Sequence, residues 1–189
     1  MSFQVHIASL TLSQFKAADI RELYVIRNHP SVRQHMTNSK PIPYRLHVSW
    51  CAKNLLDRAD PSPLLLMVRR GGHKRAAGLT QLRIKNDQAE IGVIFKEPQR
   101  HRFEAGVATV ATLHMAFCEL GLQSLISYVI PAHTAALEFN RAFGATQVES
   151  EKPGMIKLLL PRDVCLRNDH YRKVIDRYQE SINYSRSPG

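Results

Sequence analysis

Cysteine, long apolar runs and secretion signals are all scarce or missing in this 189-residue sequence. The three cysteines, Cys51, Cys118 and Cys165, are widely spaced and form no CxxC pair, which excludes a disulfide framework. No apolar run reaches the roughly 18 residues of a membrane-spanning helix, so no membrane partner is expected. The first residues, MSFQVHIASLTLSQF, lack the basic segment and apolar core of a signal peptide. We therefore expect a cytoplasmic protein.

Acidic residues are few: 16 Asp and Glu stand against 26 Lys and Arg, which gives a net charge of +10. Such an excess favours anionic partners, namely nucleic acid, phosphorylated metabolites or an acidic surface. The dense basic clusters are RRGGHKR (69–75) and QRHR (99–102). No aromatic residues alternate with them, as they do in proteins that bind single strands. This pattern argues against nucleic acid as the main ligand.

The familiar phosphate and metal signatures are also absent. The sequence contains no GxxxxGK[ST] segment and no GxGxxG after a predicted strand. None of the nine histidines has metal-ligand spacing to another, so no metal is expected.

Apolar periodicity predicts one α+β domain over residues 1–182, followed by a disordered tail at 183–189. We expect a mostly antiparallel, mixed sheet of about six to seven strands flanked by helices. The predicted strands are 3–12, 63–70, 76–85, 88–95, 124–130, 145–150 and 154–161. The predicted helices are 17–36 with a break near His29-Pro30, 44–56, 106–120, 133–143 and the polar C-terminal helix 168–182.

The helix predicted to start near Gly106 raises a chemical question. It is apolar nearly all round, which is typical of a buried helix. Its first N–H groups need partners, and Ala105 is a poor capping residue. A glycine there permits close approach of a ligand, so an anion could satisfy these groups. Water or loop carbonyls would satisfy them equally well, and the residues alone leave both alternatives open.

The order of these elements resembles the GNAT superfamily of acetyl-CoA-dependent N-acetyltransferases. The resemblance rests on FEAGVAT (103–109) before the buried helix and on HTAALEFNRAFGA (133–145) after the next strand. IRNHPSVR (26–33), HVSW (47–50) and AEIGV (89–93) are similar to segments of one branch of the superfamily. That branch holds the ribosomal-protein alanine acetyltransferases and the amino-sugar acetyltransferases of pseudaminic acid synthesis.

The resemblance implies an acetyl-CoA site between splayed central strands at 88–95 and 124–130. It implies that the loop at 100–109 wraps the pyrophosphate through backbone amides, and that an amide near Val93–Phe95 polarises the thioester carbonyl. Several positions depart from the family pattern: Phe103 replaces a Gln or Arg, Val110 a Glu, and His133 an Asn. The residues so assigned to acetyl-CoA are Val93, Ile94, Phe95, Arg102, Phe103, Gly106, Val107, Ala108, Thr109, His133 and Asn140.

The implied reaction is direct transfer from acetyl-CoA to a deprotonated amine. Three residues are candidates for the catalytic roles. Glu90 is either the base that takes the amine proton or a strand carboxylate paired with an arginine. Tyr128 is either an active-site group or a core tyrosine. Asn140 falls where the family commonly carries a tyrosine as general acid, and an amide cannot act as an acid. Either Tyr128 or another group substitutes, the thiolate leaves unaided, or the protein binds acetyl-CoA but transfers poorly.

The acceptor is expected to be a small amine that carries negative charge, specifically a nucleotide-linked amino sugar. This choice follows from the resembled branch and the net charge of +10. Candidate acceptor-binding residues are Arg27, Arg33, Tyr44 and Trp50. The alternatives are acetylation of a protein N-terminus, such as that of a ribosomal protein, and a non-catalytic acyl-CoA-binding module. Helix 168–182 is polar enough to be a lid or the interface of a homodimer.

Overall fold

A nine-stranded mixed sheet runs through the computed structural model, which describes residues 2–36, 38–57, 62–71, 75–97, 102–178 and 182–187. The strand order is β7-β8-β6-β5-β4-β3-β2-β1-β9. The strands are β1 (Ser2–Ile7), β2 (Leu10–Gln14), β3 (Leu64–Arg70), β4 (Ala76–Lys85), β5 (Gln88–Phe95), β6 (Ser124–Val129), β7 (Thr146–Val148), β8 (Ile156–Pro161) and β9 (Asn183–Ser187).

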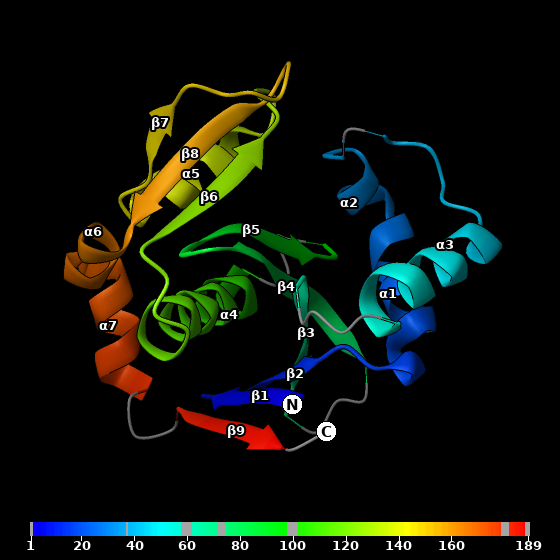
Figure 1. Ribbon diagram of the computed structural model, residues 1–189, viewed down its shortest axis with the longest axis horizontal. Coiled ribbons are helices and arrows are strands. Elements are labelled where there is room, and N and C mark those ends of the chain that lie inside the picture. Colours follow the sequence, from blue (N-terminus) through cyan, green and yellow to red (C-terminus); the bar gives the residue numbers. More distant parts are fainter. Residues whose placement is uncertain are drawn as a thin grey trace.

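Helices cover both faces of this sheet (Figure 1). A 3₁₀ turn at Ala17–Asp19 precedes α1. A π-helical turn at Ala52–Leu56 extends α3, and another at Met115–Glu119 extends α4. The α-helices are α1 (Ile20–Asn28), α2 (Pro30–Arg33), α3 (Tyr44–Cys51), α4 (Arg102–His114), α5 (Thr134–Ala142), α6 (Arg162–Arg167) and α7 (Asp169–Tyr178). No helix within the described ranges is long and apolar enough to cross a membrane.

The predicted α+β class and the antiparallel meander of β3, β4 and β5 are confirmed. The meander places its turn at Asn86–Asp87, where Asn86 adopts a φ of 57°. An asparagine tolerates this left-handed conformation better than most residues. The prediction of a break in the first helix is also confirmed, because α1 ends at Asn28 and α2 starts at Pro30.

The N-terminal strand prediction was wrong in one respect. Residues 3–12 form a hairpin of β1 and β2, turning at Ala8, rather than one strand. Ala8 has a φ of 52°, in the left-handed region. Because alanine is not a residue that favours this region, the sequence did not indicate a turn there. The additional strands β2 and β9 are the reason that the sheet exceeds the six to seven strands expected.

The C-terminal prediction also needs correction. Residues 183–187, predicted to be disordered, form β9 and pair antiparallel with β1. The predicted helix 168–182 is α7, which ends at Tyr178, and residues 179–181 lie outside the described ranges. Helix α6 was not predicted, although Pro161, the last residue of β8, stands at its N-cap.

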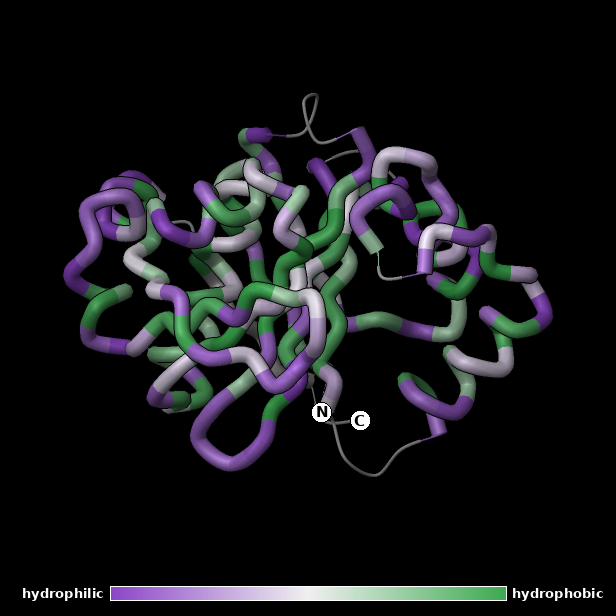
Figure 2. Tube along the Cα trace, turned by 90° about the horizontal axis from the view of Figure 1, so that it is seen from above, coloured by the Kyte–Doolittle hydropathy of each residue, from purple (hydrophilic) through white to green (hydrophobic). Residues whose placement is uncertain are grey.

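The two faces of the sheet carry separate apolar clusters. The larger cluster joins α4 to the sheet, and its side chains include Phe117 and Leu113 of the helix and Leu82 of β4. The smaller cluster joins α1 and α3 to the opposite face, through Leu23, Cys51 and neighbours. Figure 2 shows apolar residues concentrated along the central strands and hydrophilic residues along the outer helices and loops. Helix α4, predicted to be buried, is the most enclosed helix, with eight buried residues.

A substitution at Gly78 tests how tightly β4 and β5 pack. Gly78 stands opposite Phe95, and an added Cβ would meet the Ile94 carbonyl oxygen and lie 2.5 Å from Phe95 Cγ. We expect Gly78→Ala to destabilise the protein by about 1–3 kcal/mol, the usual cost of overpacking. Denaturant unfolding measures this change. Gly106→Ala is the matched control, because no atom lies within 4 Å of its added Cβ; equal destabilisation by both variants would contradict the packing account.

Candidate active site

The central opening of the sheet lies between β5 and β6. These strands pair in parallel only from Gln88 to Glu90 on β5 and from Ser124 to Ile126 on β6. Beyond Glu90, β5 continues to Phe95 against β4, whereas β6 continues to Val129 against β8. The two strands therefore diverge, and the predicted splay is confirmed (Figure 1).

The register of the β4–β5 hairpin determines which backbone groups face this opening. The two-residue turn makes Lys85 and Gln88 a hydrogen-bonded pair, and such pairs alternate along an antiparallel ladder. Lys96 N–H donates to the Ala77 carbonyl at 3.2 Å, so the same alternation of hydrogen-bonded pairs continues past the end of β5. The amides of Val93 and Phe95 accordingly point toward the splay. The amide of Ile94, a third predicted contact, points toward β4.

The start of α4 differs from the prediction. The helix is already formed at Arg102, four residues before the predicted start, and residues 98–101 lie outside the described ranges. Val107, Ala108 and Thr109 are therefore buried in the helix, where their N–H groups bond carbonyls of the preceding turn. The N–H groups available to an anion at this helix end belong to its first turn, which includes Arg102 and Phe103.

Gly106 lies one turn into α4 and has no structural reason to be glycine. Its φ is not positive, and an added Cβ would meet nothing within 4 Å. Glycine within a helix costs about 0.5–1 kcal/mol relative to alanine. A ligand that approaches the backbone closely would account for this residue, and the exposed Arg102 lies one turn earlier on the same side of the helix. The first turn of α4 is therefore the part of this helix at which the predicted pyrophosphate contact would have to lie.

Charge around this helix end is mixed. Glu104 is buried in the first turn, where the helix dipole stabilises a carboxylate. The guanidinium of Arg70 lies 3.8 Å from it. Phe103, predicted to contact the cofactor, is about half exposed, at 52%. Its ring is therefore accessible on the outer side of the helix.

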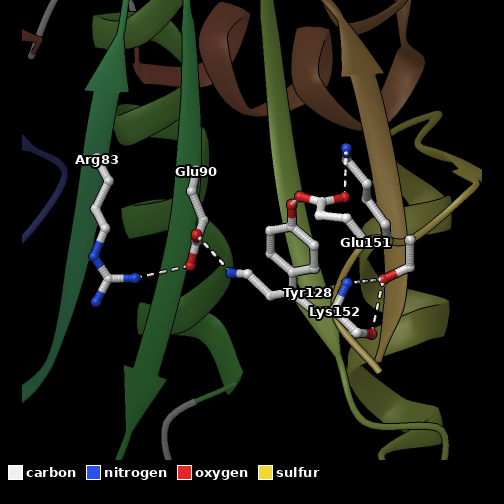
Figure 3. Close-up of polar contacts among 7 residues, drawn as sticks. Arg83, Glu90, Tyr128, Glu151 and Lys152 are labelled. Carbon is white, nitrogen blue, oxygen red and sulfur yellow. Dashed lines mark hydrogen bonds and ion pairs between the residues drawn. The ribbon is translucent and has the colours of Figure 1, made fainter. Parts of the chain in front are cut away.

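Glu90 lies on the face of the sheet that carries α1 and α3, at the last paired residue before the splay. Its two carboxylate oxygens are bound by different cations, as Figure 3 shows: Arg83 donates to Oε1 at 2.8 Å and Lys152 Nζ donates to Oε2 at 3.0 Å. Arg83 is its cross-strand neighbour on β4. Both Glu90 interpretations thus keep support, because the carboxylate is paired with an arginine and also stands at the opening.

Tyr128 faces Glu90 from β6, on the other side of the splay. Its hydroxyl donates to Glu151 Oε1, and Lys152 Nζ lies 3.4 Å from its ring centroid (Figure 3). Desolvation, the hydrogen bond to Glu151 and the charges of Glu151 and Glu90 raise the pKa of Tyr128 to about 12. The hydrogen bond from Tyr128, the backbone of Glu151 itself and the hydrogen bond from Lys157 lower the pKa of Glu151 to about 2. Tyr128 therefore keeps its proton throughout the physiological range.

Asn140 connects α5 to β6. Its Oδ1 accepts from the Ser127 hydroxyl at 2.8 Å, and its Nδ2 donates to the Ala136 carbonyl at 2.7 Å. Both polar ends of the amide are thus engaged within the protein. These bonds explain the asparagine as a link between helix and sheet.

His133 precedes α5, and its ring stacks on His35, which follows α2. The ring centroids are 3.7 Å apart and the planes differ by 10°. Burial and the proximity of His35 lower the pKa of His133, which favours the neutral form of the His133 ring. The stack links the segment after α2 to the end of the sheet at which β6 stops.

The four predicted acceptor-binding residues separate into two groups. The guanidinium of Arg27 lies 4.5 Å from the Trp50 ring centroid, and burial lowers its pKa. Trp50 and Arg83 also line a cavity of about 300 Å³, together with Asn54, Ser62 and Pro63.

Arg33 and Tyr44 lie elsewhere in this region. Arg33 donates to the carbonyls of Asn28 and Ser39, so it holds the chain after α2. The ring of Tyr44 packs edge-on against Tyr24 with centroids 5.0 Å apart, and 48% of the residue is exposed.

Two important side chains were missed by the sequence analysis. Arg83 could have been found, because a two-residue turn at Asn86–Asp87 places it opposite Glu90. Lys152 could not, because only the folding of the β7–β8 connection brings it to β5. Among the described residues, no group of three or more His, Cys, Asp or Glu side chains could hold a metal ion.

Comparison with known proteins defines the class to which this fold belongs. A family model described as an acetyltransferase (GNAT) domain matches residues 9–146. The splayed strands β5 and β6 and the start of α4 thus lie within an acetyltransferase domain. The chain belongs to the GNAT acetyltransferase family, whose members use acetyl-CoA. A search of curated proteins finds no match.

Solved structures share the fold at low sequence identity. Spermidine N-acetyltransferase from Vibrio cholerae, in complex with CoA and spermine, has 17% identity and a TM-score of 0.69, covering 84% of this chain and 99% of its own. A GNAT-family acetyltransferase from Bacillus anthracis has 15% identity and a TM-score of 0.68, covering 85% and 99%. A domain from Methanocaldococcus jannaschii has 15% identity and a TM-score of 0.67, covering 80% and 97%. None of these distinguishes the narrower branch predicted from the sequence.

A Gly106→Ala variant tests whether Gly106 contributes to cofactor binding independently of its effect on stability. We expect affinity for CoA, measured by calorimetry, to fall at least tenfold, because the methyl group would occupy the space left for the pyrophosphate. The free energy of unfolding should hold or rise by about 0.5–1 kcal/mol, since alanine favours the helix. Unchanged CoA affinity in this variant would contradict the assignment of Gly106 to the cofactor site.

Proposed function

We propose that this chain transfers acetyl from acetyl-CoA directly to a small amine, and that Glu90 takes the proton of that amine. The position of Glu90 is the observation that supports the proposal most. Its carboxylate lies at the last β5–β6 pair, next to the opening in which the family resemblance implies that acetyl-CoA binds. A positioned carboxylate that removes a proton typically contributes about 10²–10⁴-fold to a rate.

Acetyl-CoA supplies the acetyl group as a thioester, which an amine can attack. The amides of Val93 and Phe95 point into the splay and are the candidates to hold the carbonyl oxygen as it gains charge. Backbone donors fixed in a strand need no rearrangement during the reaction, which is the advantage of a preorganised oxyanion site. Val93 and Phe95 also pack against the larger apolar cluster, so their surroundings exclude water on that side.

Neither of the two candidate residues is a strong acid for the departing thiolate. Asn140 cannot act as one, and the pKa of Tyr128 near 12 is far above the value that suits proton donation at neutral pH. A thiol of ordinary pKa, about 8.5, leaves readily as the thiolate. We infer that the thiolate departs unaided and that Tyr128 serves the acceptor side through its ring.

The acceptor proposed is an amine that carries an anionic group, with a nucleotide-linked amino sugar as the specific choice. Arg83 supports this choice, because its guanidinium both lines the cavity and bonds Glu90. An amine at Glu90 would thus bring an attached anion near Arg83 and Arg27. The flat ring of Trp50 in the same cavity suits an extended ligand that stacks.

A panel of acceptors tests this function. The protein is incubated with acetyl-CoA and a nucleotide-linked amino sugar, a free amino sugar, spermidine or an N-terminal peptide, and release of free thiol is followed. We expect the highest kcat/KM with the nucleotide-linked sugar. Preference for spermidine, the substrate class of the Vibrio cholerae structure, or for the peptide would contradict the anionic acceptor. CoA binding without thiol release for any acceptor would favour a non-catalytic module.

Substitution of Glu90 tests the proposed base. Glu90→Gln should lower kcat/KM about 100-fold or more, because the amide cannot take a proton. Calorimetry should show unchanged CoA affinity, since Glu90 faces the acceptor side of the sheet. Glu138→Gln, a change at an exposed residue of α5, is the matched control and should retain wild-type rates. A Glu90→Gln variant with wild-type kcat/KM would refute the role of this carboxylate.

A further inference from the structure

An amine of the chain itself already lies where the proposed function requires the acceptor amine. Lys152 Nζ is 3.0 Å from Glu90 Oε2 on β5 and 3.4 Å from the centroid of the Tyr128 ring on β6. Figure 3 shows this side chain extending between the two diverging strands. A carboxylate and an aromatic face together form a site suited to an alkylammonium group.

The backbone of Lys152 is anchored while its side chain reaches across the splay. Ser150 Oγ accepts from the Lys152 amide at 3.3 Å and donates to the Lys152 carbonyl at 3.1 Å. The Met155 amide also donates to that carbonyl, at 3.2 Å. The side chain is 44% exposed, so its flexible stem can move the amine without disturbing the core.

We propose that Lys152 is an intramolecular acceptor and that the protein acetylates its own Lys152 Nζ. This inference rests on the proposed function. Glu90 takes one proton from the ammonium group, and the nitrogen lone pair then attacks the thioester carbon of acetyl-CoA. The new C–N bond forms and the C–S bond breaks. The second proton lost from nitrogen goes to the thiolate, so the products are an Nζ-acetyl amide, free CoA and one proton on Glu90.

The geometry distinguishes Lys152 from its neighbour Lys157. Lys157 Nζ bonds Glu151 at 3.0 Å and lies 5.9 Å from the Tyr128 ring centroid. The carboxylate that Lys157 binds therefore belongs to Glu151 and not to Glu90, the proposed base. Because an amine held beside its base reacts at a high effective concentration, self-acetylation should favour Lys152 over Lys157.

Acetylation would also change the site. The acetylated nitrogen is neutral, so it loses its ion pair with Glu90 and its attraction to the Tyr128 ring. Glu90 would then keep Arg83 as its cationic partner and become accessible to an external amine.

Site-resolved mass spectrometry tests the proposal. The full chain is incubated with isotopically labelled acetyl-CoA, sampled over time and digested, and the label is quantified at each lysine. We expect Lys152 to be labelled at least tenfold faster than Lys157, with a rate constant independent of protein concentration. Glu90→Gln should slow labelling of Lys152 about 100-fold. Lys152→Arg should remove that label and leave Lys157 at its wild-type level.

Five results would overturn the inference. Equal labelling of Lys152 and Lys157, or labelling of Lys152 that ignores Glu90→Gln, would indicate uncatalysed chemistry. A rate constant proportional to protein concentration would indicate transfer between molecules. Thiol release with an added amine, but no label on Lys152, would refute self-acetylation and leave the proposed function intact. Absence of both reactions despite CoA binding would refute the two together.

Discussion

The short parallel pairing of β5 and β6 is the constraint on which the rest of this structure depends. Only three residue pairs join the strands before they separate, at Glu90 and Ile126. Each strand keeps an antiparallel partner on its outer side, β4 for β5 and β8 for β6, so divergence leaves neither strand without a ladder. The sheet can therefore open at its centre and still keep most of its backbone hydrogen bonds.

This opening brings the chemical groups together from distant parts of the chain. Val93 and Phe95 direct amides into it, α4 begins beside it, and Glu90 marks its narrow end. Burial stabilises the arrangement, because α4 packs its apolar surface under the same strands. The two faces of the sheet differ: α4 covers one of them, and the side of α1 and α3 carries Arg27, Trp50 and the cavity.

Local patterns predicted a large part of the fold. The meander of β3, β4 and β5 follows from alternating apolar residues and the Asn86–Asp87 turn, and the break at Pro30 follows from the geometry of proline. Errors arose where no local signal exists. Ala8 turns a hairpin in a conformation that alanine rarely adopts. The start of α4 was placed at Gly106, because glycine was taken as a boundary although the helix includes it.

The sequence by itself determined the α+β class, the family resemblance and the likeness of its segments to a cofactor site, because these depend on periodicity and on the order of elements. It also limited the acid chemistry, since an amide at residue 140 cannot donate a proton as an acid does. Only the tertiary structure decided that Lys152 and Tyr128 lie beside Glu90, whereas the local hairpin already places Arg83 opposite it. Lys152 is 62 residues from Glu90 along the chain. No periodicity or local propensity relates such residues, because their contact arises only when β6 and β8 close the sheet beside β5.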